Sequence, residues 1–151
     1  MGVDVGRARV GVAASDAAGS LAMPVETVQR ASDAPRALER VRELADEYAA
    51  VEIVVGLPLS LSGADTPSTQ DARDFATLLA QGRTPVRLVD ERMSTVTAQA
   101  GMRAAGRKAK RQRSVIDQAA AVVILQHALD AERGSGRPAG SVVENAQGEE
   151  D

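Results

Sequence analysis

The stretch that decides the fold is Gly2-Val3-Asp4-Val5-Gly6, at the start of the chain. A short turn follows it, and then the apolar run Val10-Gly11-Val12-Ala13-Ala14. Residues 2–6 and 9–15 are therefore predicted to form a β-hairpin. The valines on both sides of Asp4 predict that this acid lies in the centre of a sheet. A buried carboxylate must either take up a proton or have a cation beside it, so Asp4 is the first candidate for a functional residue.

Two interpretations of Asp4 are open. Arg7 or Arg9 in the hairpin could neutralise it within the sheet. A buried ion pair needs very good geometry to compensate for the desolvation of both charges. Central strands seldom keep an acid without a reason, and this favours the functional interpretation.

The remaining pattern predicts an α/β fold with one mixed sheet. Leu21–Val28 is predicted to be a third strand, and Pro24 indicates that this strand lies at a sheet edge, because proline has no N–H to donate. Two further strands are expected at 51–56 and 86–90. Four helices are expected near 35–48, 67–79, 94–106 and 115–129. Crossover rules then give a five-stranded sheet of order 3-2-1-4-5, counted along the chain, with helices on both faces.

The bulk composition indicates a single domain. The chain has 151 residues, of which 44% are hydrophobic, and it has no cysteine. A domain at 1–131 is expected, and the Gly-, Pro- and acid-rich residues 132–151 are predicted to form a disordered tail. We expect a cytoplasmic protein, because there is no cysteine, no signal peptide and no apolar run long enough to span a membrane. The one histidine, His127, lies in an apolar run and is expected to be packed.

Acids also stand at the ends of later elements. Asp90 and Glu91 follow an apolar strand, and strand periodicity does not settle which of them faces a site, because the strand is ending. Solvated charge at the end of a strand would explain either acid. Asp117 has a simple explanation too, because Ser114 and Asp117 fit a capping box at the start of a helix.

Taken together, the three carboxylates Asp4, Glu91 and Asp117 predict a metal site. Ligands bind at the carboxyl ends of strands in such sheets, where Asp4 and Glu91 are expected to lie. Oxygen ligands select Mg²⁺ or Mn²⁺, and one or two such ions suit the hydrolysis of a phosphodiester bond. Without a cation, clustered carboxylates would raise one another's pKa.

A basic segment predicts contact with nucleic acid although the net charge of the chain is −3. A run of basic residues without acids is typical of a surface that meets phosphate. Tyr48 and Phe75 are the only aromatic residues, so recognition of shape and backbone is favoured over base stacking. Ser60, Ser62 and Thr66 could add hydrogen bonds to phosphate, but such residues are also common in loops. The candidate phosphate-binding residues are Arg7, Arg9, Arg103, Arg107, Lys108, Lys110, Arg111 and Arg113.

These motifs resemble the YqgF/RuvX family, whose members have the RNase H-like fold. The resemblance covers residues 2 to about 130 and implies that the catalytic acids are Asp4, Glu91 and Asp117, which favours Glu91 over Asp90. Family members usually carry several residues before the first strand, where this chain has only Met1, so we expect a first strand that is short at its start. The motifs are Gly2–Gly6, Arg9–Ala13 with Ser15-Asp16, Val55–Leu59, Asp90–Arg92 with Ser94-Thr95, and Ile116–Ala121 with Ile124–Gln126.

The resemblance implies a metal-dependent hydrolase of endonuclease type. Its expected role is maturation of the 5′ end of the 16S ribosomal RNA precursor, and the alternative is resolution of Holliday junctions in DNA recombination. The partner would be structured RNA or branched DNA. The protein would be a monomer or a homodimer, and junction resolution would require a two-fold dimer. A non-catalytic nucleic-acid-binding factor in transcription is a further alternative. An actin-like or sugar-kinase ATPase is disfavoured, because 151 residues are too few for its two domains.

Overall fold

The computed structural model of the chain describes residues 1–30, 34–91 and 109–144. The helix expected near 94–106 lies outside these ranges. The strands are β1 (Gly2–Val5), β2 (Arg9–Ser15), β3 (Ala22–Gln29), β4 (Ile53–Leu57), β5 (Val86–Asp90) and β6 (Ser141–Val142). The helices are α1 (Ala34–Glu47), α2 (Pro67–Leu79) and α4 (Ala109–Ser135).

One sheet of order β3-β2-β1-β4-β5-β6 forms the centre of the molecule. β1 pairs antiparallel with β2, with Asp4 opposite Gly11, and it pairs in parallel with β4. β4 pairs in parallel with β5. The predicted order 3-2-1-4-5 is confirmed for the first five strands, and β3, which contains Pro24, lies at the edge as expected.

A sixth strand corrects the prediction of five. β6 pairs antiparallel with β5, with Leu88 opposite Ser141. The Arg87 side chain binds the two residues that precede β6. Its Nε donates to the carbonyl oxygen of Ala139 at 2.7 Å, and its Nη2 donates to that of Gly140 at 3.0 Å. Residues 132–144 thus contain the end of α4 and a short strand, where a disordered tail was expected from residue 132.

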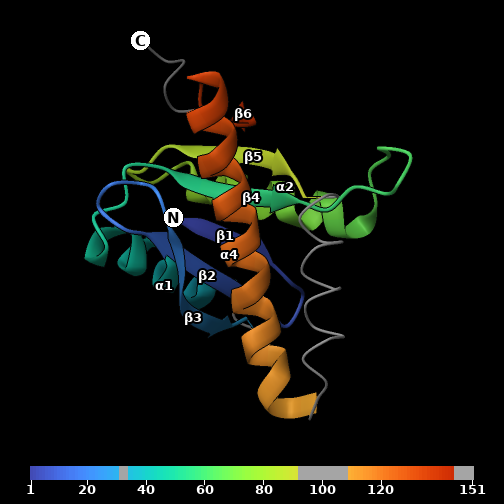
Figure 1. Cartoon of the computed structure of the whole chain (residues 1–151). Helices are drawn as coiled ribbons and strands as arrows, with labels where there is room; N and C mark the ends of the chain where they lie inside the picture. The colour runs from blue at the N-terminus through green and yellow to red at the C-terminus, as the bar shows by residue number, and fades with distance from the viewer. Residues whose placement is uncertain (31–33, 92–108, 145–151) are drawn as a thin grey trace.

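The helices cover both faces of the sheet, as the sequence predicted. Figure 1 shows α4 crossing one face, with α1 and α2 on the other. Val3, Val5, Val10 and Val12 pack against α1 and α2 in the larger core cluster. On the opposite face, α4 contributes the buried side chains of Ala121, Ile124, Leu125 and Ala128.

Helix α4 is longer than predicted, and one side of it is exposed to solvent. It begins at Ala109, so Ser114 is inside the helix and the predicted capping box of Ser114 and Asp117 is wrong. His127 is exposed, so the prediction of a packed histidine is also wrong. Despite its apolar centre, α4 does not meet the length and hydropathy of a membrane span, and neither does any other helix within the described ranges.

Candidate active site

Asp4 points to the face of the sheet that α4 crosses. Its neighbours Val3 and Val5 are buried against α1 and α2, and side chains alternate along a strand, so Asp4 faces the opposite way. Gly2 confirms this direction, because a Cβ placed on it would lie 2.7 Å from the Cβ of Leu125 in α4. Asp4 is therefore a half-buried carboxylate between the central strand and α4.

Glu91 lies just past the end of β5 and faces the same way. Val89, two residues earlier, packs against Ile124 and Ala128 of α4. The Glu91 N–H donates to the carbonyl oxygen of Leu57 at 3.3 Å, which continues the β4–β5 pairing beyond the strand end. Only 9% of Glu91 is exposed, whereas Asp90 is an exposed residue. Of the two neighbouring acids, Glu91 is the one that the fold turns inward.

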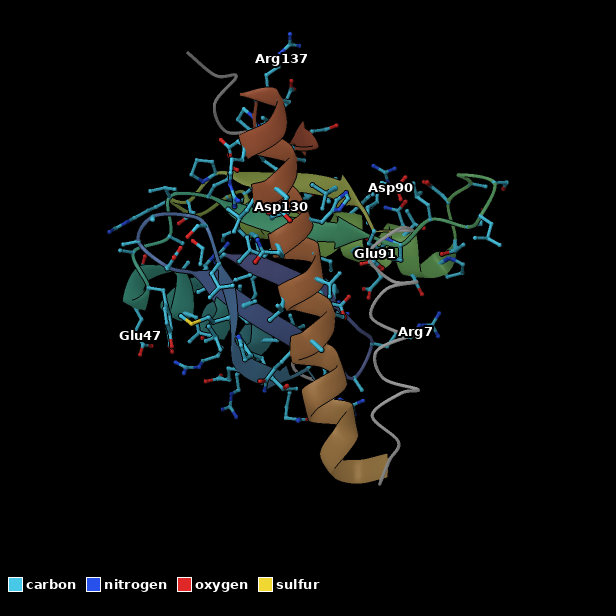
Figure 2. All side chains as sticks on the ribbon, viewed as in Figure 1. Arg7, Glu47, Asp90, Glu91, Asp130 and Arg137 are labelled. Atoms are coloured by element: carbon cyan, nitrogen blue, oxygen red, sulfur yellow. The ribbon has the colours of Figure 1, made fainter. Side chains whose placement is uncertain are left out.

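Gly56 makes room for the Glu91 carboxylate. It lies in β4, between the strands that carry Asp4 and Glu91, and it pairs with Val89. A Cβ on Gly56 would overlap the Oε2 atom of Glu91 and would lie 2.5 Å from the Cδ1 atom of Ile124. The absence of a side chain at this position lets the Glu91 carboxylate lie over the middle strand, towards Asp4. Figure 2 shows Glu91 at this end of the sheet, on the same side of the molecule as Asp90 and Arg7.

The charges of the two acids act on each other. Burial, followed by the negative charges of Asp4 and Asp90, raises the pKa of Glu91 to about 7. Like charges that face each other at a partly buried site favour a proton or a cation between them. The donor set consists of carboxylate oxygens, which are the ligands that Mg²⁺ and Mn²⁺ prefer. The described residues at this site thus fit a divalent cation.

Replacing Gly56 by alanine should damage this site. The added methyl group would displace the Glu91 carboxylate and Ile124, and such overpacking costs about 1–3 kcal/mol. We expect a lower unfolding temperature and a loss of cleavage of at least tenfold, taking about 1.4 kcal/mol of transition-state stabilisation per factor of ten. Gly134→Ala in α4 is the matched control, because a Cβ there meets nothing within 4 Å. Equal stability and activity in the two variants would contradict this placement of Gly56.

Other predicted site residues lie wholly or partly outside the described part of the chain. Asp117 belongs to α4, and its side chain is among those that the structure does not describe. Arg103, Arg107 and Lys108 precede α4 and lie outside the described ranges. Within those ranges there is no group of three His, Cys, Asp or Glu side chains that could hold a metal ion. Of the other candidate phosphate-binding residues, Lys110, Arg111 and Arg113 belong to α4, and the structure does not describe their side chains. Arg7 and Arg9 lie around the β1–β2 turn.

The loop after β4 is held by its own hydroxyl groups. Ser60 Oγ and Ser62 Oγ are 2.9 Å apart, and the Ala64 N–H donates to Ser60 Oγ at 3.0 Å. Thr66 caps α2 and forms a capping box with Thr69. Thr69 is fully buried, and its hydroxyl also donates to the carbonyl oxygen of Pro58. These contacts give the serines and Thr66 a structural role at the end of the sheet where Glu91 lies.

Solved structures of the same fold define the class. The chain resembles the Thermus thermophilus RuvC structure with a TM-score of 0.52 and 20% sequence identity, over 93% of this chain and 97% of that one. It also resembles T. thermophilus RuvC in complex with a Holliday junction substrate, with a TM-score of 0.54 and 18% identity, over 93% and 96% of the two chains. The protein therefore has the RNase H-like fold that the sequence predicted.

The family follows from closer relatives. A family model described as "RuvX: Holliday junction resolvase" matches residues 1–131, and the chain belongs to this family. A Streptomyces coelicolor protein named "Putative pre-16S rRNA nuclease" is 58% identical over 146 residues, which cover 95% of this chain and 87% of the relative. A Leifsonia xyli protein of the same name is 54% identical, over 95% and 93% of the two chains. By its family, the protein is a nuclease, a hydrolase of phosphodiester bonds.

Proposed function

We propose that this protein is a metal-dependent endonuclease that matures the 5′ end of the 16S ribosomal RNA precursor in the bacterial cytoplasm. The observation that carries the proposal is the pair of inward-facing carboxylates, Asp4 and Glu91, on the face crossed by α4. The choice of RNA rests on the names of relatives that are 58% and 54% identical to this chain.

Asp117 is proposed as the third acid. It stands seven positions before Ile124, and a spacing of seven residues returns to the same side of an α-helix. Ile124 lies over Gly56, so this side of α4 faces the sheet. Seven residues correspond to about 10 Å along the helix. Because α4 begins at Ala109, no capping role is left to explain an acid at 117.

Asp4 and Glu91 differ in their parts in the proposed chemistry. A divalent cation at this site would activate the attacking water and stabilise the charge on the leaving oxygen, with one or two ions bound. Asp4 would be held rigidly, because it lies within the central strand. Glu91 must give up its proton before it can bind the cation, and in the metal-free fold its pKa is raised to about 7, so proton and cation compete for it near neutral pH. Activity should therefore rise with pH through this range.

The basic residues would hold the nucleic acid by its backbone. Arg7 is exposed in the turn after β1, beside the candidate site. Phe75 is buried at 3% exposure, which removes one of the two aromatic side chains from any role in base stacking. Binding by shape and phosphate charge fits structured RNA.

Holliday junction resolution is the second candidate function. The description of the matching family and the likeness to a RuvC complex with a junction favour it. This activity would require two copies of the chain related by a two-fold axis, so that two sites cut opposite strands. RNA maturation by a monomer has no such requirement.

One panel of substrates separates the two functions. The wild-type protein would be incubated, with Mg²⁺ and with Mn²⁺, with a precursor rRNA leader, a four-way DNA junction and a matched linear duplex. Preferential cutting of the rRNA leader is the expected result. Preferential symmetric cutting of the junction would overturn the RNA proposal in favour of resolution. If nothing is cut and salt-sensitive binding is retained, the protein is a non-catalytic binding factor.

A further inference from the structure

A partly buried ion pair joins the end of β3, α2 and the turn that follows β1. Arg30, directly after β3, donates from Nη1 and Nη2 to the two carboxylate oxygens of Asp71 in α2, at 2.6 and 2.8 Å. Its Nη1 also donates to the carbonyl oxygen of Gly6 at 3.0 Å. The guanidinium group lies over the Phe75 ring, 5.3 Å from its centroid. The exposed fractions of the two side chains are 14% for Arg30 and 29% for Asp71.

The turn that Arg30 holds begins two residues after Asp4. Its first hydrogen bond runs from the Gly6 N–H to the carbonyl oxygen of Arg9 at 2.9 Å, and a Cβ on Gly6 would lie 2.7 Å from that oxygen. The backbone N–H of Arg30 donates to the carbonyl oxygen of Ala8 at 2.9 Å. Arg30 therefore contacts the turn twice, once through its side chain and once through its backbone. The exposed residues that this turn presents to solvent are Arg7 and Ala8.

The charges around Asp71 link the pair to Arg7. Hydrogen bonds from Arg30 lower the pKa of Asp71, and the positive charge of Arg7 lowers it further. Asp71 in turn raises the pKa of Arg30. The Asp71 carboxylate is thus ionised at neutral pH. It attracts both Arg30, which holds the turn, and Arg7, which lies in the turn.

We propose that Arg30, held by Asp71, is a positioning residue for nucleic-acid binding. It fixes the Gly6–Arg9 turn in one conformation, so that Arg7 is presented to a backbone phosphate of the substrate beside Asp4. This proposal rests on the proposed nuclease function, because it assigns Arg7 to the substrate. An ion pair with only a structural role would stabilise the fold without affecting substrate binding.

A second ion pair of the same chemistry provides the control. Arg40 in α1 donates from Nε and Nη2 to the two carboxylate oxygens of Glu26 in β3, at 2.8 and 2.7 Å. These side chains are 37% and 34% exposed, and Arg40 donates to Glu26 and Glu43 rather than to the Gly6–Arg9 turn. Asp71→Asn and Glu26→Gln each remove one charge from a bidentate pair. Only the first change should loosen the turn.

Amide hydrogen exchange tests the anchoring without any assay of activity. In Asp71→Asn, the N–H groups of Gly6 and Arg30 should exchange at least tenfold faster than in the wild type. In Glu26→Gln, exchange at these positions should be unchanged. Equal exchange at Gly6 in both variants would overturn the proposal, whatever the protein is found to cut.

Cleavage kinetics on a precursor rRNA leader test the link to Arg7. Asp71→Asn should raise KM about tenfold, which corresponds to about 1.4 kcal/mol of lost binding, with little change in kcat. In the Asp71→Asn background, Arg7→Gln should raise KM no further. In the Glu26→Gln background, Arg7→Gln should raise KM as much as it does in the wild type. Additive losses in both backgrounds would refute the positioning role. If the wild type cuts nothing, the nuclease proposal fails, and KM is replaced by the Kd for the same RNA.

Discussion

Asp4→Asn is expected to abolish metal-dependent cleavage while nucleic-acid binding is retained. A metal ion contributes several kcal/mol of transition-state stabilisation in enzymes of this kind. A loss of roughly 4 kcal/mol lowers the rate about 1000-fold, and we expect at least this effect. Binding should persist, because the proposed phosphate contacts come from arginines and lysines outside the acid pair. The measurement is single-turnover cleavage, with a gel-shift titration of the same substrate in parallel.

Loss of folding would not account for that result. Asp4 helps to raise the pKa of Glu91, so its replacement by asparagine relieves repulsion in the metal-free protein. Asp4→Asn should therefore be at least as stable as the wild type at pH 8 without metal. Asp74→Asn is the matched control, because Asp74 is exposed on α2 and bonds to Gln70 of the same helix. Cleavage by Asp4→Asn at the rate of Asp74→Asn would contradict the proposed role of Asp4.

Glu91→Gln is expected to inactivate the enzyme and to stabilise its metal-free form at high pH. The pKa of Glu91 is raised from 4.5 to about 7 on folding. Between these two values the folded state keeps a proton that the unfolded state has lost, so the wild-type protein loses stability as pH rises through this window. At pH 8 the cost of ionising Glu91 in the fold is about 3–3.5 kcal/mol, from a rise of about 2.5 pKa units at about 1.4 kcal/mol per unit. Glutamine avoids this cost.

Thermal unfolding in EDTA at pH 4.5 and pH 8 measures this effect. The unfolding temperature of Glu91→Gln should exceed that of the wild type by about 7–14 °C at pH 8, and the difference should shrink towards pH 4.5. Glu52 also has a raised pKa, but it is present in both proteins and cancels in the comparison. Glu39→Gln, at an exposed position in α1, is the control. A difference between the wild type and Glu91→Gln that does not change with pH would show that Glu91 is not a buried, repelled carboxylate.

Local patterns predicted the sheet well. The valines around Asp4, the turn after Gly6 and Pro24 in the third strand set the first three strands and their order. They also predicted that Asp4 lies inside the sheet. The sequence left open which acid after β5 faces inward, because alternation is undefined at a strand end, whereas the structure shows Glu91 buried and Asp90 exposed.

Long-range contacts account for most of what the sequence did not predict. β6 is exposed and only two residues long, and the hydrogen bonds from Arg87 to Ala139 and Gly140 join residues more than 50 positions apart. The run Ala109–Ser114 has no apolar period, so periodicity placed the start of α4 too late, although lysine, arginine and glutamine favour helix. The role of Gly56 was missed because it depends on contacts with residues far away in the sequence. A glycine inside an apolar strand can signal a close approach, but only the fold shows that Glu91 and Ile124 make that approach.

The most direct test of the acid site is the metal dependence of cleavage in four proteins measured together. These are the wild type and the single variants Asp4→Asn, Glu91→Gln and Asp117→Asn, each titrated with Mn²⁺ on the precursor rRNA leader after treatment with EDTA. We predict that the wild type cuts only when Mn²⁺ is restored, with a saturable dependence, and that each variant is at least about 1000-fold slower. Undiminished cutting in EDTA, or wild-type rates in any of the three variants, would contradict a metal site formed by these three acids.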